Sequence, residues 1–472
     1  MQIVSKMNKN LYNIHILGIG FMFVFSAFIT AGFIAAIVLK DFDSNGIDSK
    51  TGFYSLSIIY ACLGMANWFS PAVVKKLGPE VSLFLSAMPY TGFIFCMINP
   101  YMWSIFTFSA LLGVGGGVLW TASGEVIAKN SPGDTKAKNT GIFWSWFNTS
   151  MLVGNVFLYF YLGDAAKISD TQRYVIYLVL GVLCSVGTCT FLFLAPVSSD
   201  SEKSKIVPSF VYIARKVCGK TKEDPDKEET KGGLKSVLQP IADAARYCKT
   251  KQMCLLYAPV IFTGVSLNFW SSVFITVIGN VFPNRSYLAL GGISTGVGEI
   301  AAGFIWGRLS NKIGRHGVVI ASSFINLTLY ALSYVSFPSD AATTTAAVTE
   351  EISIIPSSIY LSLGLGLLLG LGDGGFNVSI YAALGTIYES NPAPAFAMFK
   401  FVQSMIGAGA FVYCGHLLLP WQLVILAATC LMGCVSFAFL ERLFPSQILE
   451  EKPDKEAGKS FIPAPKEAME TL

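Results

Sequence analysis

Residues 287–306 read YLALGGISTGVGEIAAGFIW, an apolar stretch that contains a single acidic or basic residue, Glu299. A helix of about 20 residues crosses the hydrocarbon core of a bilayer. Similar stretches recur along the chain of 472 residues, of which 53% are hydrophobic and 13% are charged. Soluble domains carry about 25% charged residues. The composition therefore excludes a water-soluble fold.

Twelve apolar blocks are long enough to span a membrane, and a polar stretch separates them into two groups of six. We predict an all-α membrane protein with twelve transmembrane helices in two pseudo-symmetric six-helix bundles. The predicted spans lie near residues 13–39, 52–74, 79–98, 102–127, 141–162, 174–195, 253–282, 287–306, 317–337, 356–381, 395–419 and 421–440.

This grouping also defines the expected domains. They are an N-terminal six-helix bundle at 1–196, a cytoplasmic linker at 197–250, a C-terminal six-helix bundle at 251–445 and a disordered cytoplasmic tail at 446–472. A shift of the first half by 255 positions places Gly115 and Gly117 on Gly370 and Gly372. Weak internal symmetry of this kind is typical of transporters built from repeated halves.

Lysine and arginine define the expected orientation. If both termini are cytoplasmic, all but five of the 33 lysines and arginines face the cytoplasm. The exceptions are Lys40, Lys50, Lys167, Arg173 and Arg285. Positive residues concentrate on the cytoplasmic side of membrane proteins, so we expect both termini there. The sequence does not distinguish the plasma membrane from an internal membrane.

Glu299, Asp373 and Lys400 are charged residues inside predicted spans. A charge in the bilayer core is costly and normally faces a protein interior or a watery path. Asp373 and Lys400 have similar depths, which suggests a static ion pair or a pair that opens on proton or substrate binding, with separate roles for the two residues as the remaining alternative. Glu299 has no cation at its depth. We expect it to be a proton-binding site or a neutral acid hydrogen-bonded to a neighbouring helix.

Three amides extend the list of substrate-binding or ion-binding candidates. Asn377 lies one turn after Asp373, and Asn148 and Gln403 are related by the internal repeat. These amides either bind a ligand or hydrogen-bond between helices. In the external loop between the seventh and eighth spans, Asn284 begins the sequon Asn-Arg-Ser and is a glycosylation candidate.

The scattered cysteines and three histidines form no metal-ligating spacing, and no nucleophile is placed beside a base. We therefore predict neither a metal nor a cofactor, and no enzymatic activity. The expected partners are the lipid bilayer and a small solute, with proton coupling as one option, or a channel or receptor subunit. Nucleic acid is not among them.

A loop between the eighth and ninth spans contains Gly307, Asn311, Lys312, Gly314 and Arg315. It resembles the loop signature of the major facilitator superfamily, with Asn311 in place of the usual acid. Glycine permits a tight turn there, and the cations fit the cytoplasmic face.

Two further stretches give a more specific resemblance. Residues 113–124 (GVGGGVLWTASG) and 139–144 (NTGIFW) resemble the fourth and fifth spans of the Unc-93 family. Residues 370–373 (GLGD) and 391–404 (NPAPAFAMFKFVQS) resemble its major facilitator superfamily domain-containing protein 11 branch. The family usually has an amide where this chain has Glu125, which we interpret as structural.

The resemblance implies the major facilitator fold, in which two six-helix bundles surround a central cleft. The family includes transporters, a regulatory subunit of potassium channels and a trafficking chaperone for receptors. Two hypotheses follow. The chain is either a secondary transporter of a small solute that works by alternating access, or a non-transporting channel regulator or receptor chaperone.

Overall fold

The computed structural model describes residues 8–42, 46–131, 136–195, 246–344, 349–388 and 392–444. Its elements are helices: α1 (Lys9–Phe42), α2 (Ser49–Ala66), α3 (Ser70–Leu77), α4 (Pro79–Cys96), α5 (Met102–Lys129), α6 (Lys136–Leu162), α7 (Asp170–Thr190), η3 (Phe191–Phe193), α10 (Lys251–Asn268), η4 (Phe269–Val273), α11 (Phe274–Val281), α12 (Ser286–Ser336), α13 (Ile359–Ile387), α14 (Pro392–Cys414) and α15 (Leu419–Leu443). The all-helical prediction is confirmed. Residues 446–472 and most of the predicted linker lie outside the described residues.

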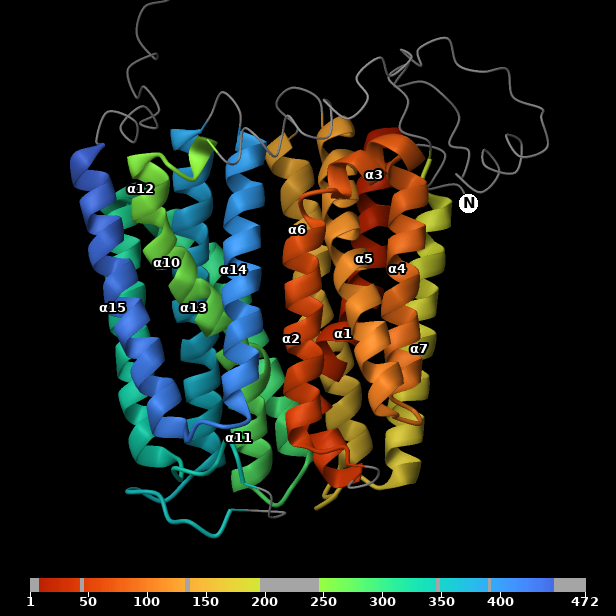
Figure 1. Ribbon diagram of the computed structural model, residues 1–472, viewed down its shortest axis with the longest axis vertical. Coiled ribbons are helices and arrows are strands. Elements are labelled where there is room, and N and C mark those ends of the chain that lie inside the picture. The colour runs from red at the N-terminus through yellow and green to blue at the C-terminus, as the bar shows by residue number, and fades with distance from the viewer. Residues whose placement is uncertain are drawn as a thin grey trace, which may run out of the picture.

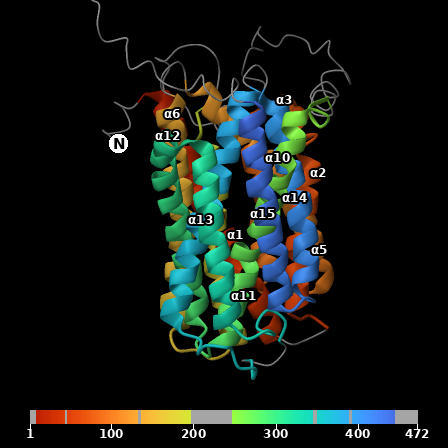
Figure 2. The ribbon, with the colours of Figure 1, turned by 90° about the vertical axis from the view of Figure 1, so that its left-hand side faces the viewer.

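The long helices run side by side in two groups (Figure 1). Helices α1 to α7 form the N-terminal half, and α10 to α15 form the C-terminal half, which faces the viewer in Figure 2. Between the halves, α2 packs against α14, α6 packs against α12, and α1 packs against η4 and α11. We call the end at which α1 begins the near end, and the end at which α1 finishes the far end.

Nine of the described helical segments are long and apolar enough to span a bilayer. The bent pair α2–α3 raises the number to ten if it forms one span. The span predicted near residues 52–74 is not one straight helix, because the axes of α2 and α3 differ by 69° across a short break. Pro71 stands in the first turn of α3. Proline lacks an N–H and disfavours helix in the residue before it.

Glycines with positive φ form the sharp bends that follow α3 and interrupt α12. Gly314 has φ 72° and ψ 165° inside α12, and Gly78 has φ 86° and ψ 152° between α3 and α4. Side chains with a Cβ rarely adopt this backbone conformation. The predicted turn of the loop motif is therefore made by Gly314, and the corresponding loop of the first half contains an equivalent glycine.

Close backbone contacts join α13 to the first part of α12. A Cβ on Gly370 would lie 2.6 Å from the backbone nitrogen of Glu299, and one on Gly298 would meet the carbonyl of Leu367. In the N-terminal half, Gly117 makes a similar contact with Ala66 on α2. Small residues allow membrane helices to approach this closely.

We predict that Gly370→Ala destabilises the protein by about 1–3 kcal/mol, because the new methyl group overpacks the α12–α13 contact. Gly364→Ala is the matched control on the same helix, since nothing lies within 4 Å of its Cβ position. The control has the same gain in helix propensity without the clash. Thermal unfolding in detergent measures both changes. Equal melting temperatures for the two variants would contradict the packing described.

Candidate functional site

Two carboxyl groups meet where α12 and α13 pack together. Glu299 lies on α12 and Asp373 on α13, and their carboxyl groups interact across the helix contact made at Gly298, Gly370 and Gly374. Glu299 Oε2 also lies 3.5 Å from the Cβ position of Gly374. Only 3% of Asp373 is exposed, and Glu299 Oε1 is buried. The sequence placed both residues at membrane depth, and the structure brings them side by side.

Polar groups from other elements surround Asp373. Asn377 Nδ2 donates a hydrogen bond of 2.8 Å to Asp373 Oδ2. Ser266 on α10 and Tyr330 on α12 interact with Asp373, and their buried hydroxyl groups have no other hydrogen-bond partner among the described residues. Glu299 Oε1 and Asp373 Oδ1 have no well-formed hydrogen bond to any described residue. The cluster therefore has buried acceptors with unused hydrogen-bonding capacity.

Lys400 on α14 forms a second polar centre, separate from the carboxyl pair. Its Nζ donates a hydrogen bond of 3.0 Å to Gln403 Oε1 and lies 5.0 Å and 5.5 Å from the ring centres of Phe399 and Tyr381. Within the described residues, Lys400 and Asp373 interact at longer range and form no ion pair. The helix that bears Lys400, α14, packs mainly against α2 and α10 rather than α13.

The remaining predicted residues occupy other parts of the fold. Asn148 is half-buried on α6 and makes no hydrogen bond to the described residues. Gly307, Asn311 and Lys312 lie on α12 before its bend. Arg315 follows the bend and is 6% exposed. It donates to Thr386 Oγ1 at 2.9 Å and lies 3.8 Å from Glu441 Oε1, so it holds the near ends of α13 and α15.

An ion pair that the sequence reasoning missed joins the two halves at the far end. Arg285 is fully buried, and its Nε and Nη2 donate to the two oxygens of Asp41 at 3.2 Å and 3.1 Å. Arg285 also donates to the carbonyl of Gly279. Two parallel bonds of this kind fix geometry as well as charge. We call this pair the far-end clasp.

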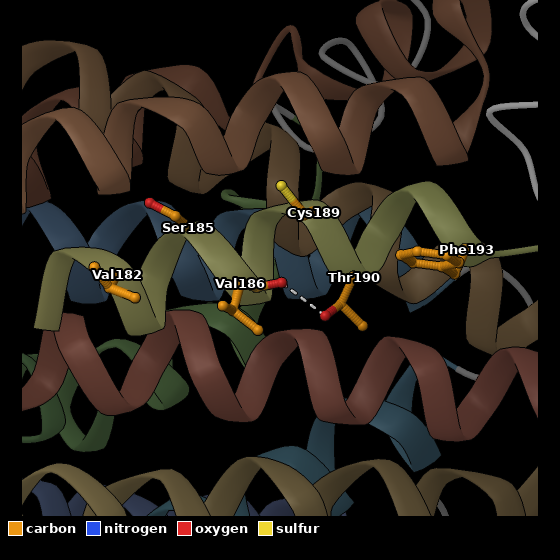
Figure 3. Close-up of a pocket in the computed structure, with 6 residues that line it drawn as sticks. All are labelled: Val182, Ser185, Val186, Cys189, Thr190 and Phe193. Atoms are coloured by element: carbon orange, nitrogen blue, oxygen red, sulfur yellow. Dashed lines mark hydrogen bonds between the residues drawn. The ribbon is translucent and has the colours of Figure 1, made fainter. Parts of the chain in front are cut away.

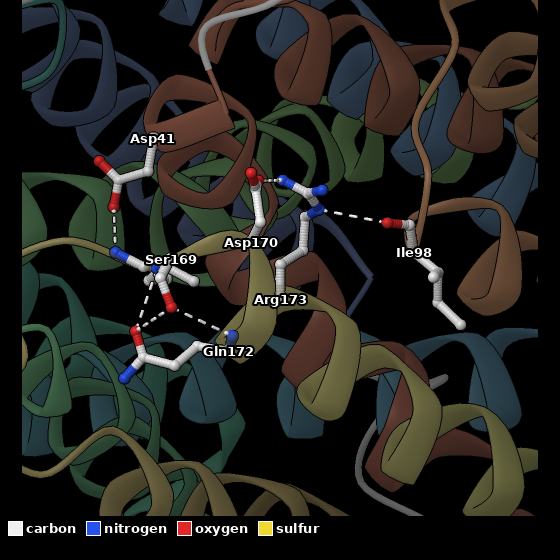
Figure 4. A network of polar contacts seen from close by, with 7 residues as sticks. Asp41, Ile98, Ser169, Asp170, Gln172 and Arg173 are labelled. Carbon is white, nitrogen blue, oxygen red and sulfur yellow. Dashed lines mark hydrogen bonds and ion pairs between the residues drawn. The ribbon is translucent and has the colours of Figure 1, made fainter.

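Neighbouring contacts extend the far-end clasp into the N-terminal half. The backbone N–H of Ile168 donates to Asp41 Oδ2 at 2.9 Å, and Arg285 N donates to the Ala165 carbonyl at 2.8 Å. Figure 4 shows Asp41 beside the start of α7, where Ser169 and Gln172 form a helix cap. Charged residues near helix ends are usually solvated, and no sequence pattern connects positions so far apart.

Asn284 lies next to the far-end clasp. Its Nδ2, the atom to which a glycan would be attached, donates a hydrogen bond of 2.9 Å to Asp164 Oδ1. Its Oδ1 accepts hydrogen bonds from Ser286. A glycan on Asn284 would displace the contact with Asp164. Glycosylation of this residue stays a prediction.

One surface hollow lies away from the charged cluster. Its volume is about 340 Å³, and its lining residues all belong to α7 and η3 (Figure 3). Val182, Val186 and Phe193 within it are exposed. An apolar groove on one outward-facing helix surface fits contact with lipid chains. It does not provide the charged or amide side chains that a solute site needs.

Comparison with known proteins places these features in a family. Residues 43–438 match the family model described as "Ion channel regulatory protein UNC-93". The chain is 37% identical to UNC93-like protein MFSD11 of Xenopus laevis over 93% of this chain and 97% of that protein. It is 22% identical to Protein unc-93 homolog A of Danio rerio, with 92% of each chain covered. These matches confirm the predicted resemblance.

A solved structure shows a similar fold. The crystal structure of peptide transporter POT in complex with sulfate superposes with a TM-score of 0.64, and the match covers 94% of this chain and 95% of that chain. The sequence identity is 11%, so this likeness concerns the fold alone. The two chains therefore share an arrangement of helices typical of multi-pass membrane proteins.

We predict that Arg285→Met costs about 3–5 kcal/mol of stability, because it leaves Asp41 buried without its cation. The double variant Arg285→Met/Asp41→Asn should lose less than Arg285→Met alone. Asp170→Asn is the control. Its carboxylate pairs with Arg173 at the same end but is 82% exposed, and such pairs contribute about 0–1 kcal/mol. Thermal unfolding of the purified variants measures these effects. Additive losses in the double variant would rule out the coupling.

Proposed function

The chain belongs to the UNC-93 family, and from this premise we propose that it is a secondary transporter that moves a small solute by alternating access. We further propose twelve spans in two six-helix bundles, at 1–196 and 251–445, joined by the linker at 197–250. Nine helical segments already meet the length and hydropathy of a span. The bent pair α2–α3 and helices α4 and α6 would bring the number to twelve, because they lie alongside the spanning helices (Figure 1).

We propose that the near end faces the cytoplasm. Lys75 and Lys76 on α3, Lys129 at the end of α5 and Arg442 at the end of α15 lie at this end. The positive-inside rule favours this orientation. The far-end clasp would then close the outer side of the protein.

The carboxyl pair of Glu299 and Asp373 is the observation that supports transport most directly. Buried ionisable groups in membrane helices are costly and mark substrate or ion pathways. From this pair, Asn377 and then Tyr381 lead along α13 towards the near end, where the Lys400 ammonium lies over the Tyr381 ring. A polar route reaching one end, with a buried ion pair closing the other, fits a protein that exposes its site to one side at a time.

The second candidate is a non-transporting regulator of an ion channel or a chaperone for membrane receptors. The description of the family model, an ion channel regulatory protein, favours it. In such a protein, the carboxyl pair would stabilise one conformation and would carry no solute.

We predict solute uptake by proteoliposomes that contain only this protein. Glu299→Gln and Asp373→Asn should each lower uptake at least tenfold, because the pair lies in the proposed path. Glu125→Gln is the matched control, since Glu125 is a half-buried carboxylate paired with Lys129 at one end of α5. Its uptake should stay within twofold of the parent. Labelled solutes of several charge classes provide the assay.

Co-expression with a potassium channel distinguishes the two candidates. A change in channel current that survives Glu299→Gln, together with no uptake of any solute in the panel, would favour the regulator and exclude the transporter.

A further inference from the structure

We propose that Glu299 and Asp373 hold one proton between them, forming a carboxyl–carboxylate proton site inside the C-terminal half. Glu299 Oε2 lies 3.5 Å from the Cβ position of Gly374, the residue that follows Asp373, and the two carboxyl groups interact across the α12–α13 contact. Glycines at positions 298, 370 and 374 bring the two helices close enough to make this contact. In this site, the two carboxyl groups are the binding residues and the proton is the ligand.

Counting hydrogen-bond donors leads to this assignment. An ionised carboxylate only accepts hydrogen bonds, so two ionised carboxylates in contact have no hydrogen atom to share. Glu299 Oε1 and Asp373 Oδ1 are both buried and lack a well-formed bond to the described residues. Asn377 satisfies Asp373 Oδ2. The hydroxyl groups of Ser266 and Tyr330 can donate to Asp373, but two ionised carboxylates cannot donate to each other. One proton on the pair would supply that hydrogen bond and remove one of the two adjacent negative charges.

No charged neighbour in the described residues neutralises the pair by direct contact. Lys400 on α14 attracts Asp373 at longer range while bonding to Gln403. The other titratable groups near the cluster are the phenols of Tyr330 and Tyr413 and the thiol of Cys430, which come from α12, α14 and α15. All three are neutral at pH 7 unless strongly perturbed. Without a proton, the site would hold two negative charges against one distant ammonium.

A bound metal ion is a less suitable occupant. Transition metals need more ligands of the histidine, cysteine or carboxylate type, and the described residues contain no group of three or more that could hold a metal. A sodium ion could use the oxygens of the pair with those of Ser266 and Tyr330. We therefore treat sodium binding as an outcome of the test.

Coupling of this proton to solute transport rests on the proposed function. Loss of the proton would strengthen the attraction between Asp373 and Lys400, because the pair would gain a full negative charge. A shift of Lys400 from Gln403 towards Asp373 would then link protonation to the position of α14. Since α14 packs against α2, that shift would reach the interface between the halves.

Infrared spectroscopy of the purified full chain in lipid tests the proton site without requiring transport. The carbonyl stretch of a protonated carboxyl group differs from the bands of a carboxylate and shifts in heavy water. We expect a protonated-carboxyl band at pH 7 in the parent protein. It should disappear in the double variant, which has no carboxyl group at the site, and in Glu299→Gln, because the new amide donates the hydrogen that the shared proton supplied. Glu125→Gln should keep the band.

The amide variants also test folding. Glu299→Gln should melt within a few degrees of the parent, because glutamine keeps the shape and supplies a donor, whereas Glu299→Ala should melt lower. Identical infrared spectra for the parent and the double variant at pH 7 would overturn the proposal. So would a melting temperature that rises with sodium in the parent and not in the double variant. A missing band with intact uptake would reject the proton site alone, and a present band without uptake would reject transport alone.

Discussion

The cost of burying a charge without a partner is the constraint on which the C-terminal half depends. Glycines bring the backbones of α12 and α13 into contact at Gly298 and Gly370, so the space beside them is narrow. Glu299 and Asp373 interact at this contact. Removing two neighbouring negative charges from water is unfavourable by several kcal/mol. The sequence keeps both acids although an apolar residue would pack there at lower cost, which argues for a role in function.

The two buried acidic sites differ in how fully their hydrogen-bonding groups are paired. In the far-end clasp, Asp41 receives two bonds from Arg285 and a third from a backbone N–H. Such a satisfied pair fixes one arrangement of the halves. At the Glu299–Asp373 pair, hydrogen-bonding capacity is left over. A partly satisfied polar cluster in a medium of low polarity responds strongly to any added charge or proton. The far-end clasp therefore suits holding the two halves together at that end, and the Glu299–Asp373 pair suits binding a proton.

Much of this arrangement could be predicted from the sequence. Hydrophobic length placed the long helices, apart from the break before α3, and located Glu299, Asp373 and Lys400 at membrane depth. The partners of these residues could not be predicted, because depth does not reveal which way a helix face points. Asp373 meets Glu299 rather than Lys400 since α13 packs closely on α12 and only lightly on α14. The far-end clasp escaped prediction because Asp41 and Arg285 resemble ordinary solvated residues at helix ends.

The most direct test of the account follows protons and solute together. A pH-sensitive dye sealed inside proteoliposomes would report proton movement when a transported solute is added outside. The account predicts a change in internal pH with the parent protein, and none with the Glu299→Gln/Asp373→Asn variant. Solute uptake by the parent without any proton movement, or an unchanged dye response in the double variant, would contradict it.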